Sequence, residues 1–320
     1  MFLDAKRLFR YVLVPGALLA ASILAAVACG GDDGGEAAPG SPAAAAYTLQ
    51  PVSGPPVLGA NRIALVITDA DQLPVDAENV QVSIFRISGN TGELVARVTP
   101  TERRVEEFFP HIHEGGTVHP HPDTTILYTI DNFNFDLPGL WGFQLNAVLS
   151  DGRQIALQSE PFDVGPATWP TAGKAAPATK TSTVRDVSDV AEIDSSNPPR
   201  PYMHELSVAD ALQQHKPFAV TFSTPAFCRT AVCGPVTDMV ASFYEQYKDR
   251  MAFIHVEPYD LKKARAGQGL EVLPFIDQEW RIPSEPWTFV VGADGKVVAE
   301  FGGLFAAEEL EAALKQAAGA

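Results

Sequence analysis

Two stretches with few core-forming side chains divide the chain and limit what it can fold into. Residues 29–46 are a run of Gly, Ala, Pro and Asp, which predicts a flexible tether. Residues 166–201 are rich in Pro, Ala, Thr and Ser and are interpreted as a linker. Two segments remain, 47–165 and 202–320, and a chain of 320 residues with 46% apolar residues has enough material for a core in each.

The N-terminus has the pattern of a secretory signal. Three basic residues within the first ten precede Tyr11–Ala28, which contains no charge. The stretch Ala26–Gly30, at the end of this uncharged run, is similar to a bacterial lipobox. Residues 1–28 are therefore predicted to be a signal peptide and Cys29 to be lipid-modified. The alternative is an uncleaved transmembrane anchor, because 18 uncharged residues can just span a bilayer. Both interpretations attach the protein to the cell membrane and place the remainder on the extracytoplasmic side.

The charge of the chain argues against nucleic acid as a partner. The formal net charge is −16, and no cluster of Lys and Arg follows the first ten residues. A surface that binds phosphates needs such a cluster.

Short runs with period-two alternation or β-branched bias fill the segment 47–165. Turn signals separate them, among them Asp151-Gly152, and no helical pattern interrupts the series. Six or seven strands of this kind predict an immunoglobulin-like β-sandwich. The strands are expected at Arg62–Thr68, Val80–Ile87, Glu93–Val98, Thr125–Ile130, Trp141–Leu149 and Gln154–Leu157.

The pattern of 202–320 is mixed α/β. Ser207 is expected to cap a helix over Val208–Gln214, and Pro235–Tyr247 has helical apolar spacing. A further helix is expected at Ala306–Gln316. Strands are expected at Pro217–Thr224, Met251–Val256, Trp287–Val291 and Lys296–Phe301, the last two joined by a turn at Asp294-Gly295.

Two motifs in this segment carry a family resemblance. The stretch from Phe222 to Pro235, which contains Cys228 and Cys233, resembles the strand-to-helix corner of thioredoxin-like proteins. The stretch Ser284–Trp287 resembles the loop that holds the family's cis-proline, here Pro286. The resemblance implies an α/β thioredoxin fold for 202–320. Two departures are present, since four residues separate the cysteines instead of two, and Thr221 replaces the usual buried acid.

The same resemblance implies a thiol-disulfide oxidoreductase that acts on an extracytoplasmic protein with a thiol or disulfide. Cys228 would be the nucleophile, because a helix N-terminus stabilises a thiolate, and Cys233 would resolve the mixed disulfide. Pro286 would shape the peptide-binding groove. This chemistry requires no cofactor.

Two other interpretations of the cysteine pair remain open. The spacing after a Thr-Pro resembles peroxiredoxins of the bacterioferritin comigratory type and implies a thiol peroxidase, although Pro225 stands where a Thr is expected. The pair can also be a structural disulfide in a redox-inactive domain.

Four histidines fall within eleven residues of the first segment. They follow a His-x-His-x5-His-x-His pattern, and alternate residues of a strand face the same way, so each pair can offer two imidazoles to one ion. Copper or zinc is therefore a candidate cofactor, and a metal-binding or metallochaperone lipoprotein is the alternative function. A solvent-exposed polar loop is the other interpretation. A further histidine, His255, lies on a predicted core strand, where packing is the expected role. The four candidate ligands are His111, His113, His119 and His121.

Overall fold

The computed structural model describes residues 47–106, 124–229 and 232–319. All of them belong to one compact unit, Gly40–Ala320. The predicted signal peptide, Cys29 and the four-histidine segment lie outside the described residues. Within the described part, no helix is both long and apolar enough to cross a membrane.

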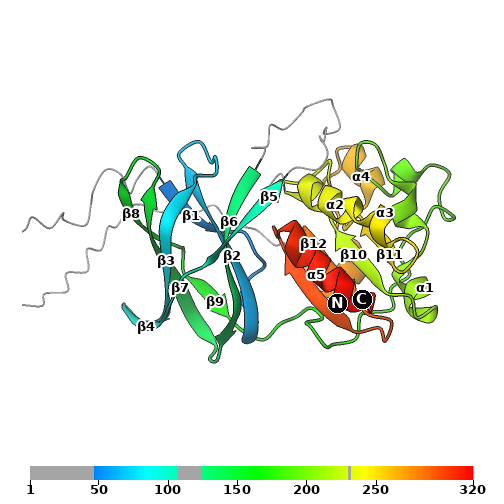
Figure 1. Cartoon of the computed structure of the whole chain (residues 1–320). Coiled ribbons are helices and arrows are strands. Elements are labelled where there is room, and N and C mark those ends of the chain that lie inside the picture. Colours follow the sequence, from blue (N-terminus) through cyan, green and yellow to red (C-terminus); the bar gives the residue numbers. More distant parts are fainter. Residues whose placement is uncertain (1–46, 107–123, 230–231, 320) are drawn as a thin grey trace, which may run out of the picture. The chain divides into compact units, whose positions relative to one another are not determined.

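The first nine strands form two antiparallel sheets (Figure 1). One sheet has the order β1-β2-β6-β5, and the other has the order β4-β3-β7-β8 with β9 paired to β7. The strands are β1 (Tyr47–Pro51), β2 (Gly59–Asp69), β3 (Ala77–Ser88), β4 (Thr91–Val98), β5 (Thr101–Glu106), β6 (Thr124–Phe135), β7 (Gly139–Leu149), β8 (Gln154–Gln158) and β9 (Phe162–Val164).

These two sheets share one apolar core. Side chains that alternate along β7 and β8 point into it, as period-two patterning requires. The core also holds a polar group, the hydroxyl of Tyr128, which donates to the carbonyl oxygen of Ala77 at 3.0 Å and accepts from its N–H at 2.7 Å. Burial raises the pKa of Tyr128 to about 12, so the phenol stays neutral there.

A third sheet occupies the C-terminal part and has the order β11-β10-β12-β13. The pair β10 and β11 is parallel, and the other pairs are antiparallel. Successive residues of β10 point to opposite faces, so Ala219 belongs to one apolar core and Val220 to another. The strands are β10 (Phe218–Phe222), β11 (Ala252–Val256), β12 (Trp287–Val291) and β13 (Val297–Gly302).

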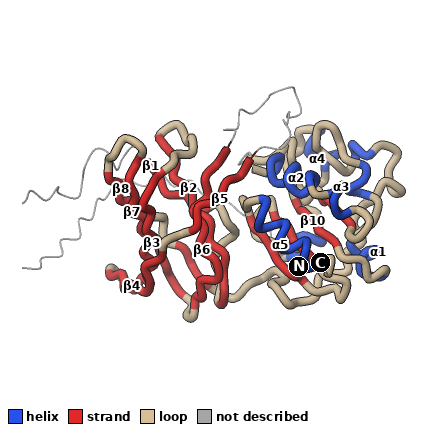
Figure 2. Tube along the Cα trace, viewed as in Figure 1, coloured by secondary structure: helices blue, strands red, loops and turns tan. Residues whose placement is uncertain are grey.

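The helices accompany this third sheet and are short (Figure 2). Ser207 caps the first of them, because its side chain accepts the N–H of Asp210 and the carboxylate of Asp210 accepts the N–H of Ser207. The α-helices are α1 (Val208–Gln213), α2 (Cys233–Ser242), α3 (Tyr244–Tyr247), α4 (Leu261–Arg265) and α5 (Ala307–Ala317). Single turns of other helix types are η2 (Val190–Glu192), η3 (Pro201–His204) and η4 (Ile276–Trp280).

The expected fold class is wrong. In the described residues, thirteen strands form three sheets, and only α2 and α5 of the five α-helices reach ten residues. The predicted helix Pro235–Tyr247 is one cause of the difference, because the chain leaves the helical pattern at Phe243 and yields two shorter helices. The expectation of an immunoglobulin-like sandwich followed by an α/β thioredoxin fold is therefore corrected to a mostly β chain with three sheets.

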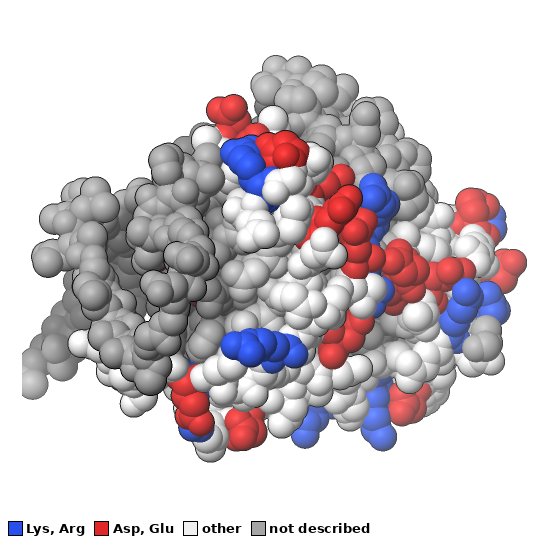
Figure 3. Space-filling model, turned by 60° about the vertical axis from the view of Figure 1, so that its left-hand side comes forward, with Lys and Arg blue, Asp and Glu red and all other residues white. Residues whose placement is uncertain are grey.

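On the face shown in Figure 3, acidic side chains of the described residues are more prominent than basic ones. Asp and Glu side chains form a band there, with Lys and Arg scattered beside it. This distribution agrees with the net charge of −16.

Candidate functional site

Cys228 and Cys233 lie together where the chain passes from β10 to α2. Both are thiols in the structure. Cys228 is half-buried in the loop before α2, and Cys233 is the fully buried first residue of that helix. The backbone N–H of Cys233 donates to the Cys228 sulfur at 3.3 Å. This donor belongs to the first turn of α2, where the free N–H groups of a helix favour negative charge.

The two sulfurs have different environments. Burial raises the pKa of the Cys233 thiol well above its ordinary value, and the hydrogen bond to Cys228 raises it further. The Cys228 sulfur faces a helix N-terminus, and Cys228 as a residue is only half-buried. The arrangement therefore separates a sulfur that can react with an outside partner from one that is protonated and shielded.

Pro286 lies at the same end of the two central strands, β10 and β12, as the cysteine loop. The peptide bond from Glu285 to Pro286 is cis, and the next residue, Trp287, pairs with Phe222 at the end of β10. Burial raises the pKa of Glu285, and negative charge at Cys228 raises it further, whereas a hydrogen bond with Tyr259 opposes this shift. Cys228, Cys233 and Pro286, the three residues expected from the sequence to be catalytic, thus lie near the same end of the sheet, with Glu285 and Tyr259 beside them.

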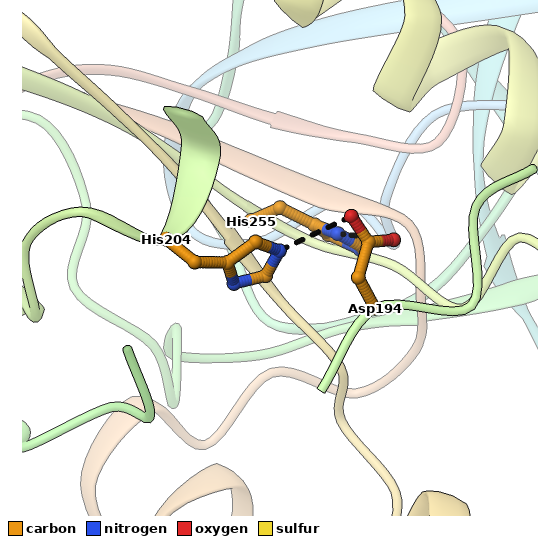
Figure 4. Close-up of side chains that lie close together, drawn as sticks. All are labelled: Asp194, His204 and His255. Atoms are coloured by element: carbon orange, nitrogen blue, oxygen red, sulfur yellow. Dashed lines mark hydrogen bonds and ion pairs between the residues drawn. The ribbon is translucent and has the colours of Figure 1, made fainter. Parts of the chain in front are cut away.

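A second cluster lies beneath the cysteine loop and consists of Asp194, His204 and His255 (Figure 4). Asp194 follows η2, His204 ends η3, and His255 lies in β11. None of the three is more than 1% exposed. Oδ2 of Asp194 lies 3.2 Å from Nε2 of His204, and Oδ1 lies 3.3 Å from Nδ1 of His255. One ligand atom from each residue lies within 4.8 Å of the other two, so this group could hold a metal ion.

Backbone groups fix the orientation of two of these side chains. The Asp194 carboxylate accepts the N–H of Ser196 at 2.7 Å and that of Arg200 at 2.8 Å. Nε2 of His255 donates to the carbonyl oxygen of Ser223 at 3.0 Å, because a carbonyl can only accept. Nδ1 of His255 faces Asp194, and within the described part of the chain it makes no hydrogen bond of acceptable geometry.

The electrostatics of the cluster follow from burial and close charges. Burial acts to raise the pKa of Asp194, but His255 and His204 hold it well below its usual range. Burial lowers the pKa of His204, whereas the nearby Asp194 outweighs burial at His255 and raises its pKa. Burial also raises the pKa of Glu257, to about 7. The contact therefore favours the ionised form of Asp194 and the protonated form of His255.

The cluster touches the cysteine loop through Ser195, the neighbour of Asp194. The Ser195 hydroxyl accepts the N–H of Ala226 at 3.1 Å, and the Ser195 N–H donates to Oε1 of Glu257 at 2.8 Å. With the bond from His255 to Ser223, these contacts hold the loop that carries Cys228. A cavity of about 190 Å³ borders the cluster, and its lining includes His204, His255, Glu257 and Tyr259.

Two members of the cluster were not predicted from the sequence. Asp194 lies in the segment interpreted as a linker, and His204 stands three residues after its end. His255 was expected to pack in the core; it is buried as expected, and it also carries the contact to Asp194. A histidine within a strand that is buried along its whole length was the one available signal, since such a side chain needs polar partners.

No protein-family model matches the chain, and the search of curated proteins found no relative.

Proposed function

We propose that the protein is a membrane-anchored, extracytoplasmic thiol-disulfide oxidoreductase that acts on a partner protein. The observation that carries the proposal is the asymmetry of the cysteine pair. The half-buried Cys228 sulfur accepts an N–H at the start of α2, and the Cys233 thiol is buried directly behind it. A partly accessible attacking sulfur and a shielded resolving sulfur are what a two-cysteine exchange reaction requires.

In the proposed reaction the Cys228 thiolate attacks one sulfur of a disulfide in the partner. The partner's S–S bond breaks, a mixed disulfide forms, and the released partner thiolate takes a proton from water. Cys233 then loses its proton, attacks the Cys228 sulfur and displaces the second partner thiolate. Glu285 is the candidate acceptor of that proton, because its charge acts on Cys233. The partner gains two electrons, and a dithiol reductant returns the Cys228–Cys233 disulfide to two thiols.

Reduction of insulin disulfides by dithiothreitol tests this activity. The wild-type protein should accelerate the reaction, and Cys228→Ser should not. Cys233→Ser is the matched control, since it keeps the attacking sulfur and loses only the resolving one. A wild-type rate equal to that of Cys228→Ser would exclude the proposed activity. Consumption of hydrogen peroxide without insulin reduction would favour the thiol peroxidase interpretation instead.

Metal binding is a second candidate function, and the donor set of the buried cluster favours it. We propose zinc or copper as the ion, because two imidazole nitrogens and one carboxylate oxygen suit both. The segment with His111, His113, His119 and His121 has the same preference and lies outside the described residues. Dialysis against metal-free buffer, followed by elemental analysis, tests the candidate. Loss of all metal from the wild-type protein would exclude it.

A further inference from the structure

One nitrogen of the buried cluster is oriented as a metal ligand and lacks a hydrogen bond. The carbonyl oxygen of Ser223 accepts Nε2–H of His255, so Nδ1 is the ring nitrogen that faces Asp194, and a metal ion bound there would displace the Nδ1 proton. Nδ1 is buried, pairs with the Asp194 carboxylate at 3.3 Å, and makes no hydrogen bond of good geometry to any residue that the structure describes. A cation between these two atoms would satisfy both. A ligating histidine is typically fixed by such a contact from its other nitrogen to a backbone carbonyl.

The distances within the cluster fit a transition metal. Zinc bonds of about 2.0–2.1 Å to nitrogen and oxygen place neighbouring ligands of a tetrahedron about 3.3 Å apart. His204 and His255 approach different oxygens of Asp194, at 3.2 Å from Nε2 to Oδ2 and 3.3 Å from Nδ1 to Oδ1, so an ion at this group would be held by both carboxylate oxygens or would need a small shift of one imidazole. The N–H groups of Ser196 and Arg200 hold the carboxylate in place from outside, at 2.7 and 2.8 Å.

The fourth coordination position decides whether this would be a closed structural site or a site open to an outside ligand. Among the described residues the group has three members, whereas structural zinc sites use four protein ligands and catalytic sites keep one position open. His204 and His255 both line the cavity of about 190 Å³, which is ample for a water, since one water needs only about 10–15 Å³ in the same measure. The charged side chains around that cavity are three carboxyls and one ammonium, which disfavours an anion: Glu192, Glu257, Asp260 and Lys262.

We propose that Asp194, His204 and His255 form a three-ligand transition-metal site whose fourth position opens into this cavity and takes an exchangeable neutral ligand, water in the first instance. The inference rests on the metal-binding candidate function and adds the open position to it. Figure 4 shows the three side chains converging from separate segments of the chain.

Cobalt(II) is the probe for this inference, because its visible absorption reports coordination directly. The measurement uses the full chain with its three cysteines, Cys29, Cys228 and Cys233, replaced by Ser and with His111, His113, His119 and His121 replaced by Ala, so that cobalt reports on the buried group. Cobalt should bind with 1:1 stoichiometry, and its spectrum should change on titration with imidazole, a small neutral donor. Azide, a small anion, should change it less. His204→Ala should weaken cobalt binding by at least the roughly 100-fold that loss of an outer contact can cause.

A variant that fills the cavity separates loss of metal binding from loss of the open coordination position. Leu273 lines the cavity, so Leu273→Trp should leave cobalt bound and remove the response to imidazole. Leu137→Trp is the matched control, because Leu137 is 43% exposed and lies outside the cavity lining. If His204→Ala does not fold, as judged by circular dichroism, the two tryptophan variants decide the question. Absence of cobalt binding would refute the metal-binding candidate itself. If cobalt binds but its spectrum does not change with imidazole, the open fourth position is refuted and metal binding is not.

Discussion

Nδ1 of His255 lies 3.3 Å from Oδ1 of Asp194, and neither side chain is more than 1% exposed. The contact joins β11 to the segment after η2, two parts of the chain that are far apart in sequence. The next residue after Asp194, Ser195, holds the N–H of Ala226 in the cysteine loop at 3.1 Å. The buried pair therefore supports the loop on which the proposed thiol chemistry depends.

Asp194→Asn should destabilise the protein strongly. The substitution removes the charge that balances His255 inside the protein, and breaking a buried ion pair costs about 3–5 kcal/mol. Urea unfolding measures the loss. Asp131→Asn is the control, because Asp131 pairs with Arg103 at a site where its side chain is 43% exposed and such pairs contribute under about 1 kcal/mol. Equal losses in the two variants would contradict a central role for the buried pair.

Alkylation should distinguish the two cysteines. At neutral pH, iodoacetamide should modify Cys228 at least about tenfold faster than Cys233, because Cys228 is partly exposed and burial raises the pKa of Cys233. Peptide mass spectrometry over time gives both rates. Unfolding in guanidinium should make the rates similar. Similar rates in the folded protein would mean that the pair lacks the proposed asymmetry.

Glu300→Gln should change how stability depends on pH. Burial raises the pKa of Glu300 from 4.5 to about 7, partly offset by the N–H of Ala172. A carboxyl whose pKa is higher in the folded state binds more protons there, so its contribution to stability is complete below about pH 4.5 and is lost as pH rises through 7.

The amide of the Glu300→Gln variant does not titrate, so the variant should gain about 1–3 kcal/mol relative to wild type between pH 4.5 and pH 8. Urea unfolding at both pH values measures this gain. Glu160→Gln, at an exposed position, is the control and should show no such gain. A pH-independent difference at position 300 would contradict the burial effect.

Cys29→Ser tests the anchoring proposal. The variant should incorporate no labelled fatty acid in a bacterial host and should leave the membrane fraction, since the lipobox-like stretch Ala26–Gly30 would no longer present a cysteine. Wild-type protein from the same host is the reference. Unchanged lipid incorporation would exclude lipidation at this cysteine.

The predicted elements that match the structure have strong local signals. The expected strands Val80–Ile87 and Trp141–Leu149 lie within β3 and β7, and the helix predicted after Ser207 is α1 with the expected cap. In contrast, β5 was missed because its sequence, Thr-Glu-Arg-Arg-Val-Glu, is mostly charged, although it pairs with β6 along its length. The predicted fold class was wrong in part because local apolar spacing does not determine where a helix ends. At Phe243 the expected long helix gives way to two shorter ones.

The candidate site was predicted in part for a similar reason. Cys228, Cys233 and Pro286 belong to recognisable local motifs, and the structure brings them to one end of a sheet. Asp194 has no such motif, because its role comes from contacts with His204 and His255, the second of which is on a different element far along the chain. Contacts of this kind depend on the tertiary arrangement and leave little trace in a single sequence.

Trapping of mixed disulfides is the measurement that tests the thiol-disulfide assignment most directly. With Cys233→Ser, Cys228 keeps its position beside the start of α2 but its mixed disulfide cannot be resolved, so partner proteins should accumulate as adducts that dithiothreitol releases. Cys228→Ser should accumulate few. The contrary result is a Cys233→Ser variant that traps nothing, together with a wild-type pair that resists reduction to potentials below about −300 mV. That result would identify the pair as a structural disulfide and contradict the proposed activity.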